Sequence, residues 1–143
     1  GDYSRRHPRW SALEEEITME LPSALVLAYL GDAVYELLVR GYLIREKGLG
    51  KVNRLHQAAV NFVRADAQAR LLRGLDSWLT EEEKAVVRRG RNTSSQPPRH
   101  ADVVTYRHAT ALECLFGYLY LKGEQERIEE LFREIVRLAE EDL

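Results

Sequence analysis

The sequence of 143 residues is poor in cysteine and in long apolar runs. Its one cysteine, Cys114, can form neither a disulfide within the chain nor a cysteine-based zinc site, so we expect a reducing compartment and a buried, unreactive thiol. No stretch reaches the roughly 18 uninterrupted apolar residues that a membrane-spanning helix requires. The N-terminus lacks the apolar segment of a signal peptide, and the cytoplasm is therefore the expected location.

Alternation of apolar and polar residues, the pattern of a half-buried strand, is also lacking, and no internal repeat is visible. Apolar residues instead recur at helical spacing between stretches of Gly, Ser and Pro. The length is that of one domain. The sequence therefore predicts an all-α protein of a single domain, with helices over 22–46, 53–63, 65 to about 74, 80–89, 102–121 and 124–141.

Three of these helices carry capping signals at their starts. Asn53 can cap the second, and Thr80 and Glu83 have the spacing of a capping box. Asp102 or Thr105 can cap the helix that follows the loop "GRNTSSQPPRHAD".

The start of the chain differs from the rest. Residues 1–20 are expected to form an irregular lead-in with a short turn of helix at "SALEEEI". The folded domain is expected to occupy residues 21–143.

The net charge of −2 hides an uneven distribution. Acids dominate the last helix, whereas basic residues dominate the stretch from Lys84 to His108. Arginines at a helix end also suit the helix dipole, which is a simpler explanation for some of them. Few aromatic residues lie nearby, so a nucleic-acid duplex is a better partner than stacked single-strand bases. The candidate contacts are Lys84, Arg88, Arg89, Arg91, Asn92, Arg99 and Arg107.

Two apolar segments each contain a single acid. Asp32 is the only charged residue in 21–35, and Glu113 is the only one in 109–121. The apolar neighbours of Asp32 are expected to be buried, and removing a carboxylate from water costs several kcal/mol unless a partner compensates. Each acid is therefore expected to have a partner.

There are two interpretations of this pair. In one, each acid meets its own arginine or lysine. In the other, the two helices approach at Gly31 and Gly117, and Asp32 and Glu113 face each other. Two such carboxylates raise each other's pKa, and a divalent cation relieves the conflict. Magnesium suits carboxylate and water ligands and serves phosphate chemistry, so this interpretation predicts a Mg²⁺ site.

Glu36 is a further candidate for that site, because it lies four residues after Asp32 on the same helix face. Arg40 follows Glu36 by four residues. This spacing also fits an ordinary surface ion pair, which is the interpretation we favour.

Several segments resemble one known family. "LGDAVYELLVR" is similar to the signature of the ribonuclease III endonuclease domain, which carries a catalytic aspartate, and "ALECLFGYLYL" is similar to its second motif, which carries a glutamate. Asp32 and Glu113 occupy these two acid positions. The likeness continues through "GKVNRLHQAAVNFVRADAQA", "LTEEEKAVVRRGRN" and "TYRHATALE". Together these segments resemble the short bacterial branch called Mini-ribonuclease III.

The resemblance implies a homodimeric, Mg²⁺-dependent endonuclease that cuts double-stranded RNA and matures the ends of the 23S ribosomal RNA precursor. It makes Asp32 and Glu113 both the catalytic acids and the metal ligands. Residues 124–143 are too few for the separate duplex-binding domain of full-length relatives. We therefore expect the catalytic domain, through its basic stretch, to hold the RNA.

The sequence also departs from full-length relatives, which carry further acids where this chain has Leu25, Ala28 and Thr110. The metal site thus has fewer protein ligands, although Thr110 can donate a hydrogen bond there. One alternative is therefore a ribonuclease III-like scaffold that binds RNA without cutting it. A helical nucleotide phosphohydrolase is another, but it requires clustered acids or a His-Asp doublet that these helices lack.

Overall fold

The structure is a computed structural model that describes residues 21–48, 50–93 and 96–141, and the elements in these ranges are helices. The all-α prediction is confirmed. The predicted lead-in of residues 1–20, with its turn of helix, lies outside the described residues. The elements are α3 (Ala24–Arg45), α4 (Val52–Val63), α5 (Ala65–Leu75), the 3₁₀ helix η1 (Asp76–Trp78), α6 (Glu81–Arg91), α7 (Val103–Leu121) and α8 (Gln125–Glu141). In the part of the chain described, none of the helices has the length and apolar character needed to cross a membrane.

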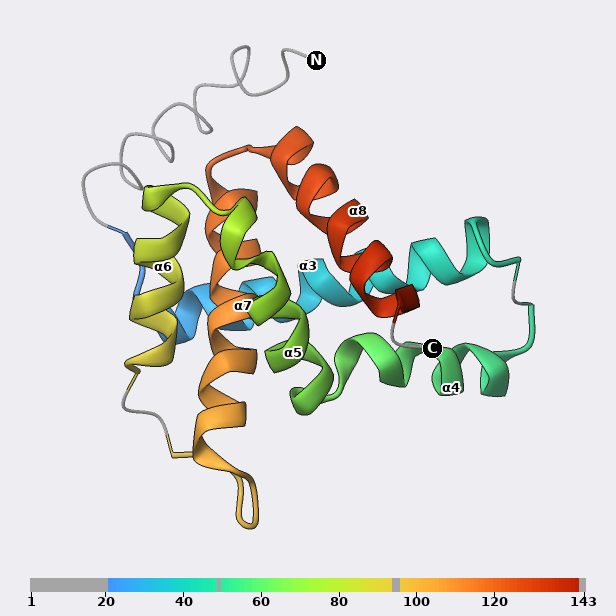
Figure 1. Ribbon diagram of the computed structural model, residues 1–143, viewed down its shortest axis with the longest axis horizontal. Helices are drawn as coiled ribbons and strands as arrows, with labels where there is room; N and C mark the ends of the chain where they lie inside the picture. Colours follow the sequence, from blue (N-terminus) through green and yellow to red (C-terminus); the bar gives the residue numbers. More distant parts are fainter. Residues whose placement is uncertain (1–20, 49, 94–95, 142–143) are drawn as a thin grey trace.

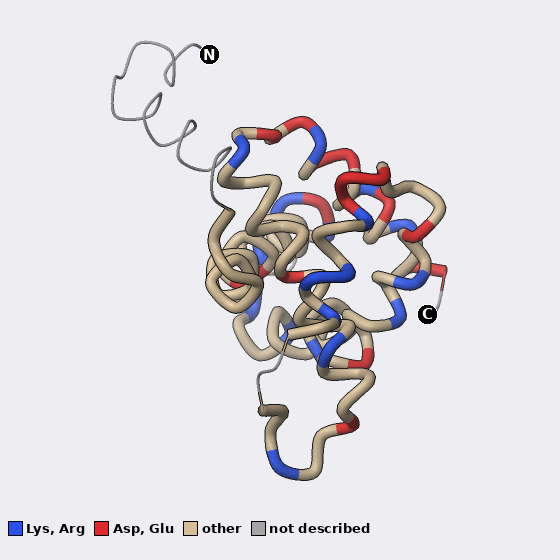
Figure 2. The backbone as a smooth tube through the Cα atoms, turned by 90° about the vertical axis from the view of Figure 1, so that its left-hand side faces the viewer, with Lys and Arg blue, Asp and Glu red and all other residues tan. Residues whose placement is uncertain are grey.

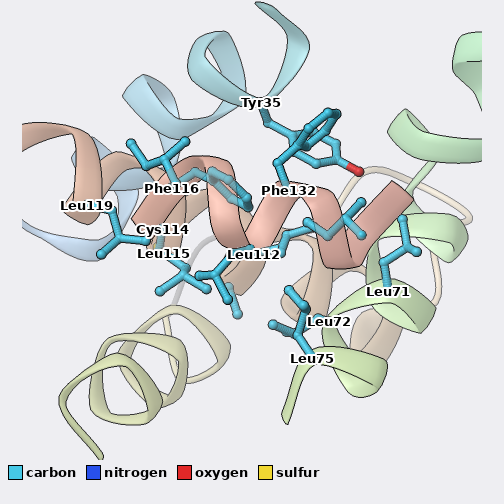
Figure 3. Packing of buried hydrophobic residues seen from close by; sticks show 14 of the residues in the cluster. Tyr35, Leu71, Leu72, Leu75, Leu112, Cys114, Leu115, Phe116, Leu119 and Phe132 are labelled. Atoms are coloured by element: carbon cyan, nitrogen blue, oxygen red, sulfur yellow. The ribbon is translucent and has the colours of Figure 1, made fainter. Parts of the chain in front are cut away.

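Helix α7 lies at the centre of the molecule, and α3, α5, α6 and α8 pack around it (Figure 1). Its side chains Leu112, Leu115 and Phe116 are fully buried in the middle of the core. The ring of Tyr35 from α3 lies 5.5 Å from that of Phe116 and 6.3 Å from that of Phe132 on α8 (Figure 3). Burying one such side chain contributes roughly 1.5–3 kcal/mol. The fold therefore depends most on α7.

Helices α3 and α7 cross at two glycines. A Cβ atom on Gly31 would lie 1.6 Å from the backbone oxygen of Glu113, and one on Gly117 would lie 2.0 Å from the backbone oxygen of Leu27. Neither position has room for a side chain, because non-bonded atoms do not approach so closely. The predicted approach of the two helices at Gly31 and Gly117 is thus confirmed.

Side-chain caps define where α3, α6 and α7 begin, and before α3 the Ser23 Oγ accepts a hydrogen bond from the backbone N of Val26 at 3.3 Å. Before α6, Thr80 Oγ1 accepts a hydrogen bond from the backbone N of Glu83 at 3.1 Å, and Glu83 Oε1 accepts one from the backbone N of Thr80 at 2.9 Å. This is the predicted capping box. Before α7, Asp102 is the cap, since its Oδ2 accepts bonds from the backbone N and the hydroxyl of Thr105 at 3.0 and 2.7 Å.

The predicted cap of α4 at Asn53 is wrong. The helix begins at Val52, and its N-cap residue is Lys51, whose side chain makes no capping bond. Asn53 Oδ1 instead accepts a hydrogen bond from the backbone N of Arg54 at 3.1 Å. Asn53 therefore lies inside the first turn, where its side chain satisfies a free backbone N–H rather than starting the helix.

Helix α8 turns an apolar stripe toward the core, as its spacing predicts. Ile128, Leu131, Phe132 and Ile135 are buried, and Leu138 is partly buried. The helix packs on α5 and α7. Helix α8 thereby covers the core on the side formed by α5 and α7.

Candidate active site

Two carboxyl groups from different helices meet where α3 crosses α7. Asp32 follows Gly31, and Gly31 packs against the backbone oxygen of Glu113. The Asp32 carboxyl acts on Glu113 through its charge and through a hydrogen bond, so the two groups are direct neighbours. The helix crossing therefore brings together the two acids that the sequence analysis paired.

Glu113 holds its proton well above the pH at which a glutamic acid in water loses it. Its pKa is raised from 4.5 to about 8, first by burial, then by the charge and hydrogen bond of Asp32, and also by the charge of Glu36. A hydrogen bond from Gln68 favours the charged form and acts in the opposite direction. At neutral pH the Glu113 carboxyl therefore keeps its proton unless a cation takes its place.

Asp32 lies on an exposed face of α3, and the expectation that its apolar neighbours are buried holds only in part: Leu27 and Tyr35 are buried, whereas three others are not. Leu25, Val26 and Tyr29 are exposed, Tyr29 to 84%. The core side of the helix is formed by other residues, namely Leu27, Ala28, Gly31, Tyr35, Val39 and Leu43. Successive residues are about 100° apart around a helix, so Asp32 points to the rim of the crossing while Gly31 points into it.

Among the described residues, no lysine, arginine or histidine forms an ion pair with Asp32 or Glu113. The interpretation in which each acid meets its own basic side chain is therefore wrong for this part of the chain. Glu36 does pair with Arg40, at 3.1 Å, as the favoured interpretation of that spacing predicts. Its charge nevertheless reaches Glu113.

Gln68 is a site residue that the sequence analysis did not single out. It lies on α5, is only 4% exposed, and hydrogen-bonds Glu113. In the sequence it is one amide in a polar helical segment, and no spacing rule connects it to Glu113. Only the packing of α5 on α7 brings the two side chains together.

The donors at this site fit a hard divalent cation. The described residues contain no group of three or more His, Cys, Asp or Glu side chains placed to hold a metal. Magnesium does not need one, because it is often bound by one or two carboxylates and keeps several waters or substrate phosphates. The suppressed ionisation of Glu113 also shows a site that lacks positive charge. Asp32 and Glu113 are thus the residues that can hold Mg²⁺, with the side chain of Gln68 beside Glu113.

Two neighbours of Glu113 on α7 have structural roles. The Thr110 hydroxyl donates a hydrogen bond to the backbone oxygen of Tyr106 at 3.0 Å, so the expected bond to the site is not made. Cys114 is buried, and its Sγ donates to the backbone oxygen of Ala24 at 2.9 Å. The predicted burial of Cys114 is confirmed, and burial raises the pKa of its thiol to about 11, which fits the expected unreactive thiol.

Three of the candidate RNA contacts lie in one cleft. Lys84, Arg88 and Arg91 line a hollow of about 350 Å³ between α5, α6 and α7. In Figure 2, several lysine and arginine positions lie in the middle of the view, while acidic positions are most frequent toward its top and upper right.

The other four candidates lie outside this cleft. Arg89 donates from Nη2 to the backbone oxygen of Pro22 at 3.2 Å and so ties α6 to the segment before α3. Asn92 is the C-cap of α6, with its side chain exposed. Arg99, in the loop after α6, and Arg107, in the first turns of α7, are both exposed. These positions stay predictions.

Comparison with known proteins identifies the family. The model of the Ribonuclease III domain matches residues 25–124, which include both carboxylates, Gln68 and every candidate RNA contact. The chain belongs to the ribonuclease III family.

The relatives of this ribonuclease III domain support the same branch of the family. The chain is 50% identical to the Mini-ribonuclease 3 of Brevibacillus brevis, over 89% of this chain and 96% of the relative. It is 44% identical to that of Clostridium tetani, over 90% of this chain and 88% of the relative. The predicted membership of the Mini-ribonuclease III branch, and with it a ribonuclease III-type endoribonuclease, is confirmed.

A solved structure agrees with this ribonuclease III domain in fold. The crystal structure of a Fusobacterium nucleatum protein matches with a TM-score of 0.73 and 31% identity, covering 80% of this chain and 93% of that chain. The nucleotide phosphohydrolase alternative finds no support in any of these comparisons.

Proposed function

We propose that this ribonuclease III-type enzyme cleaves double-stranded RNA as a Mg²⁺-dependent homodimer. The 23S ribosomal RNA precursor is its proposed substrate, the cytoplasm its proposed location, and residues 21–143 its proposed catalytic unit. The observation that carries this proposal is the pair of Asp32 and Glu113, which meet without a basic partner in the described ranges and hold the pKa of Glu113 near 8. The relatives named Mini-ribonuclease 3 support ribonuclease chemistry at this pair.

Asp32 and Glu113 are the proposed Mg²⁺ ligands. When bound, the ion polarises a phosphoryl oxygen and lowers the pKa of a bound water. A carboxylate ligand must be charged, and the hydrogen bond from Gln68 favours the charged form of Glu113 while fixing the direction of its carboxyl group. We therefore assign Gln68 a positioning role.

The depth of the two acids indicates how substrate reaches them. Asp32 lies on the exposed rim of the crossing, whereas Glu113 is half-buried behind it. A phosphodiester therefore approaches from the side of Asp32. With few protein ligands, the site leaves room for water and for the phosphate itself.

The proposed dimer uses an exposed apolar stripe on α3. Its members fall within about 120° of the helix circumference and adjoin Asp32. Such a stripe exceeds the scattered exposed apolar residues of an ordinary monomer surface. A second copy of the chain is the occupant that fits, because a twofold contact here would bring two Asp32 side chains to the same interface. The stripe consists of Leu25, Val26, Tyr29, Leu37 and Ile44.

The proposed RNA contacts remain the seven named in the sequence analysis. Duplex RNA is recognised mainly by its shape and its phosphates, so exposed arginines suffice without base-specific contacts. Arg99 and Arg107 are exposed and suit this role directly. For Arg89, the bond to Pro22 leaves the rest of its guanidinium for phosphate.

A cleavage assay tests this function. Purified protein is incubated with labelled duplex RNA in Mg²⁺ or in EDTA, and the ends of the products are determined. The proposal predicts cutting in Mg²⁺ only, with 5′-phosphates on the products. Duplex binding without cutting under these conditions would support the alternative of a non-cleaving scaffold and would contradict the proposal.

A further inference from the structure

A basic cleft lies on a different side of α7 from the carboxylate pair. It is formed where α5, α6 and α7 meet, and its volume is about 350 Å³. Its floor is apolar, formed by Leu72, Leu79 and Val87. Its positively charged or ionisable basic side chains come from three helices, and they are Arg73, Lys84, Arg88, Arg91 and His108.

The charge of this cleft is largely uncompensated. Among the described residues, Arg73, Arg88 and Arg91 form no ion pair, although most charged residues of α8 do. The Nε atom of Arg91 is buried and has no hydrogen-bond partner. Asp76 is the only acid in the lining. Three guanidinium groups and one lysine beside a single acid leave the cleft with a net positive charge, which favours an anion.

The two remaining basic residues leave room for such an anion. Lys84 has only a distant contact with Glu81, at 3.8 Å on the helix surface. His108 uses Nδ1 for the backbone oxygen of Val104, at 2.8 Å, which leaves Nε2 available to a ligand. Neither side chain is therefore tied to an acid inside the cleft.

The cleft is separate from the carboxylate pair. His108 precedes Glu113 by five residues, which corresponds to a rotation of about 140° around an α-helix. In Figure 1, α3 crosses behind α7, whereas α5 crosses in front of it and α6 runs beside it. Helix α5 contributes to both places, with Gln68 near its start at the carboxylates and Arg73 near its end in the cleft.

We propose that this cleft binds a phosphate group, gripped by Arg73, Arg88 and Arg91. One guanidinium group can bind two oxygens of a phosphate at once. Three guanidinium groups, from α5 and α6, line this cleft. The inference rests on the proposed function, because the phosphate is expected to come from the backbone of a duplex RNA. It adds Arg73 and His108 as contacts and places them away from the cutting site.

The test uses Arg73→Gln, a change at an exposed residue of α5. Binding of a labelled RNA duplex to the full chain is followed by fluorescence anisotropy in EDTA at several salt concentrations. Arg133→Gln on the exposed side of α8 is the matched control, with the same loss of charge far from the cleft. We expect Arg73→Gln to weaken binding about 3- to 10-fold and to lower the salt slope by about one, and Arg133→Gln to change neither.

A second arm distinguishes the source of the phosphate. Thermal melting of wild type and Arg73→Gln is measured with inorganic phosphate or with pyrophosphate. The reference buffers contain sodium chloride at the same ionic strength and no sulfate. Stabilisation of wild type but not of Arg73→Gln, with unchanged RNA binding, assigns the cleft to a free phosphate compound. Unchanged RNA affinity, unchanged salt slope and no Arg73-dependent stabilisation overturn the inference.

The outcome is separable from that of the proposed function. If wild type cuts duplex RNA in Mg²⁺ while Arg73→Gln behaves as wild type in both arms, the cleft inference fails and the function stands. If wild type neither binds nor cuts duplex RNA, but phosphate stabilises it in an Arg73-dependent manner, the function fails and the phosphate site stands.

Discussion

At the scale of single residues, Glu113 is the carboxyl group whose ionisation is most strongly opposed by its surroundings. Burial and the Asp32 charge both oppose its ionisation, and the bond from Gln68 only partly offsets them. The folded protein therefore binds the Glu113 proton more tightly than the unfolded chain does, with a pKa of about 8 against 4.5. This difference destabilises the metal-free fold as pH rises from about 4.5 to 8.

Replacing Glu113 by Gln should remove this loss of folding stability at high pH. In EDTA at pH 8.5 we expect Glu113→Gln to be more stable than wild type by about 1–3 kcal/mol, since the amide carries no charge to bury. The difference should shrink toward pH 5, where Glu113 is protonated in wild type. Thermal melts at several pH values measure it. Equal melting temperatures of the two proteins from pH 5 to 8.5 would show that Glu113 is not held protonated.

Metal binding should depend on the same proton. Because a cation must displace it, the affinity for Mg²⁺ is expected to rise about tenfold per pH unit from pH 6 to about 8 and then level off. Isothermal titration calorimetry with the full chain measures this, and Glu113→Gln provides the control, in which the pH dependence should be lost. An affinity of wild type that does not change over this range contradicts the assignment of Glu113 as a ligand.

At the scale of helices, the crossing of α3 and α7 is the feature that builds the site. We expect Gly117→Ala to destabilise the protein by about 3 kcal/mol or more, because its Cβ would lie 2.0 Å from the backbone oxygen of Leu27 and the helices would have to separate. Gly41→Ala is the matched control on α3. Its Cβ would meet only the movable end of Arg45, so a neutral effect or a gain of up to about 1 kcal/mol is expected.

Urea unfolding of both variants decides this point. Similar losses of stability in Gly117→Ala and Gly41→Ala would mean that the close approach of the helices is not what excludes a side chain at Gly117.

The sequence allowed most helix positions to be predicted, because caps act through neighbouring residues. The box of Thr80 and Glu83 needs only each other and the backbone. The error at Asn53 also comes from this local character. An asparagine can accept a backbone hydrogen bond both as the cap of a helix and within its first turn, so the residue alone does not show where α4 begins.

The candidate site was predictable in part. Glycines and single acids in apolar helices made the meeting of Asp32 and Glu113 one of two open interpretations. The exposure of Asp32 was not predictable from its apolar neighbours, because burial depends on the helix face and not on adjacency in sequence. Gln68 and Arg73 reach their sites through the packing of α5, and the sequence holds no local pattern that shows this.

At the scale of the whole molecule, the exposed stripe on α3 indicates how two chains associate. We expect wild type to sediment as a dimer at micromolar concentration and Tyr29→Arg to sediment as a monomer, since a charge at the most exposed apolar residue would be buried without a partner. Tyr120→Arg, at an exposed tyrosine on α7, should remain dimeric. A monomeric wild type, or a dimeric Tyr29→Arg, would remove α3 from the proposed interface.

The central claim is that Asp32 and Glu113 act together on RNA, and single-turnover cleavage of a duplex by Asp32→Asn tests it most directly. The change keeps the shape of the side chain and removes its charge. Glu46→Gln, an exposed acid at the far end of α3, is the control. We predict a loss of at least about 100-fold for Asp32→Asn in Mg²⁺ and less than a twofold change for Glu46→Gln. Cleavage by Asp32→Asn at the wild-type rate would contradict the claim.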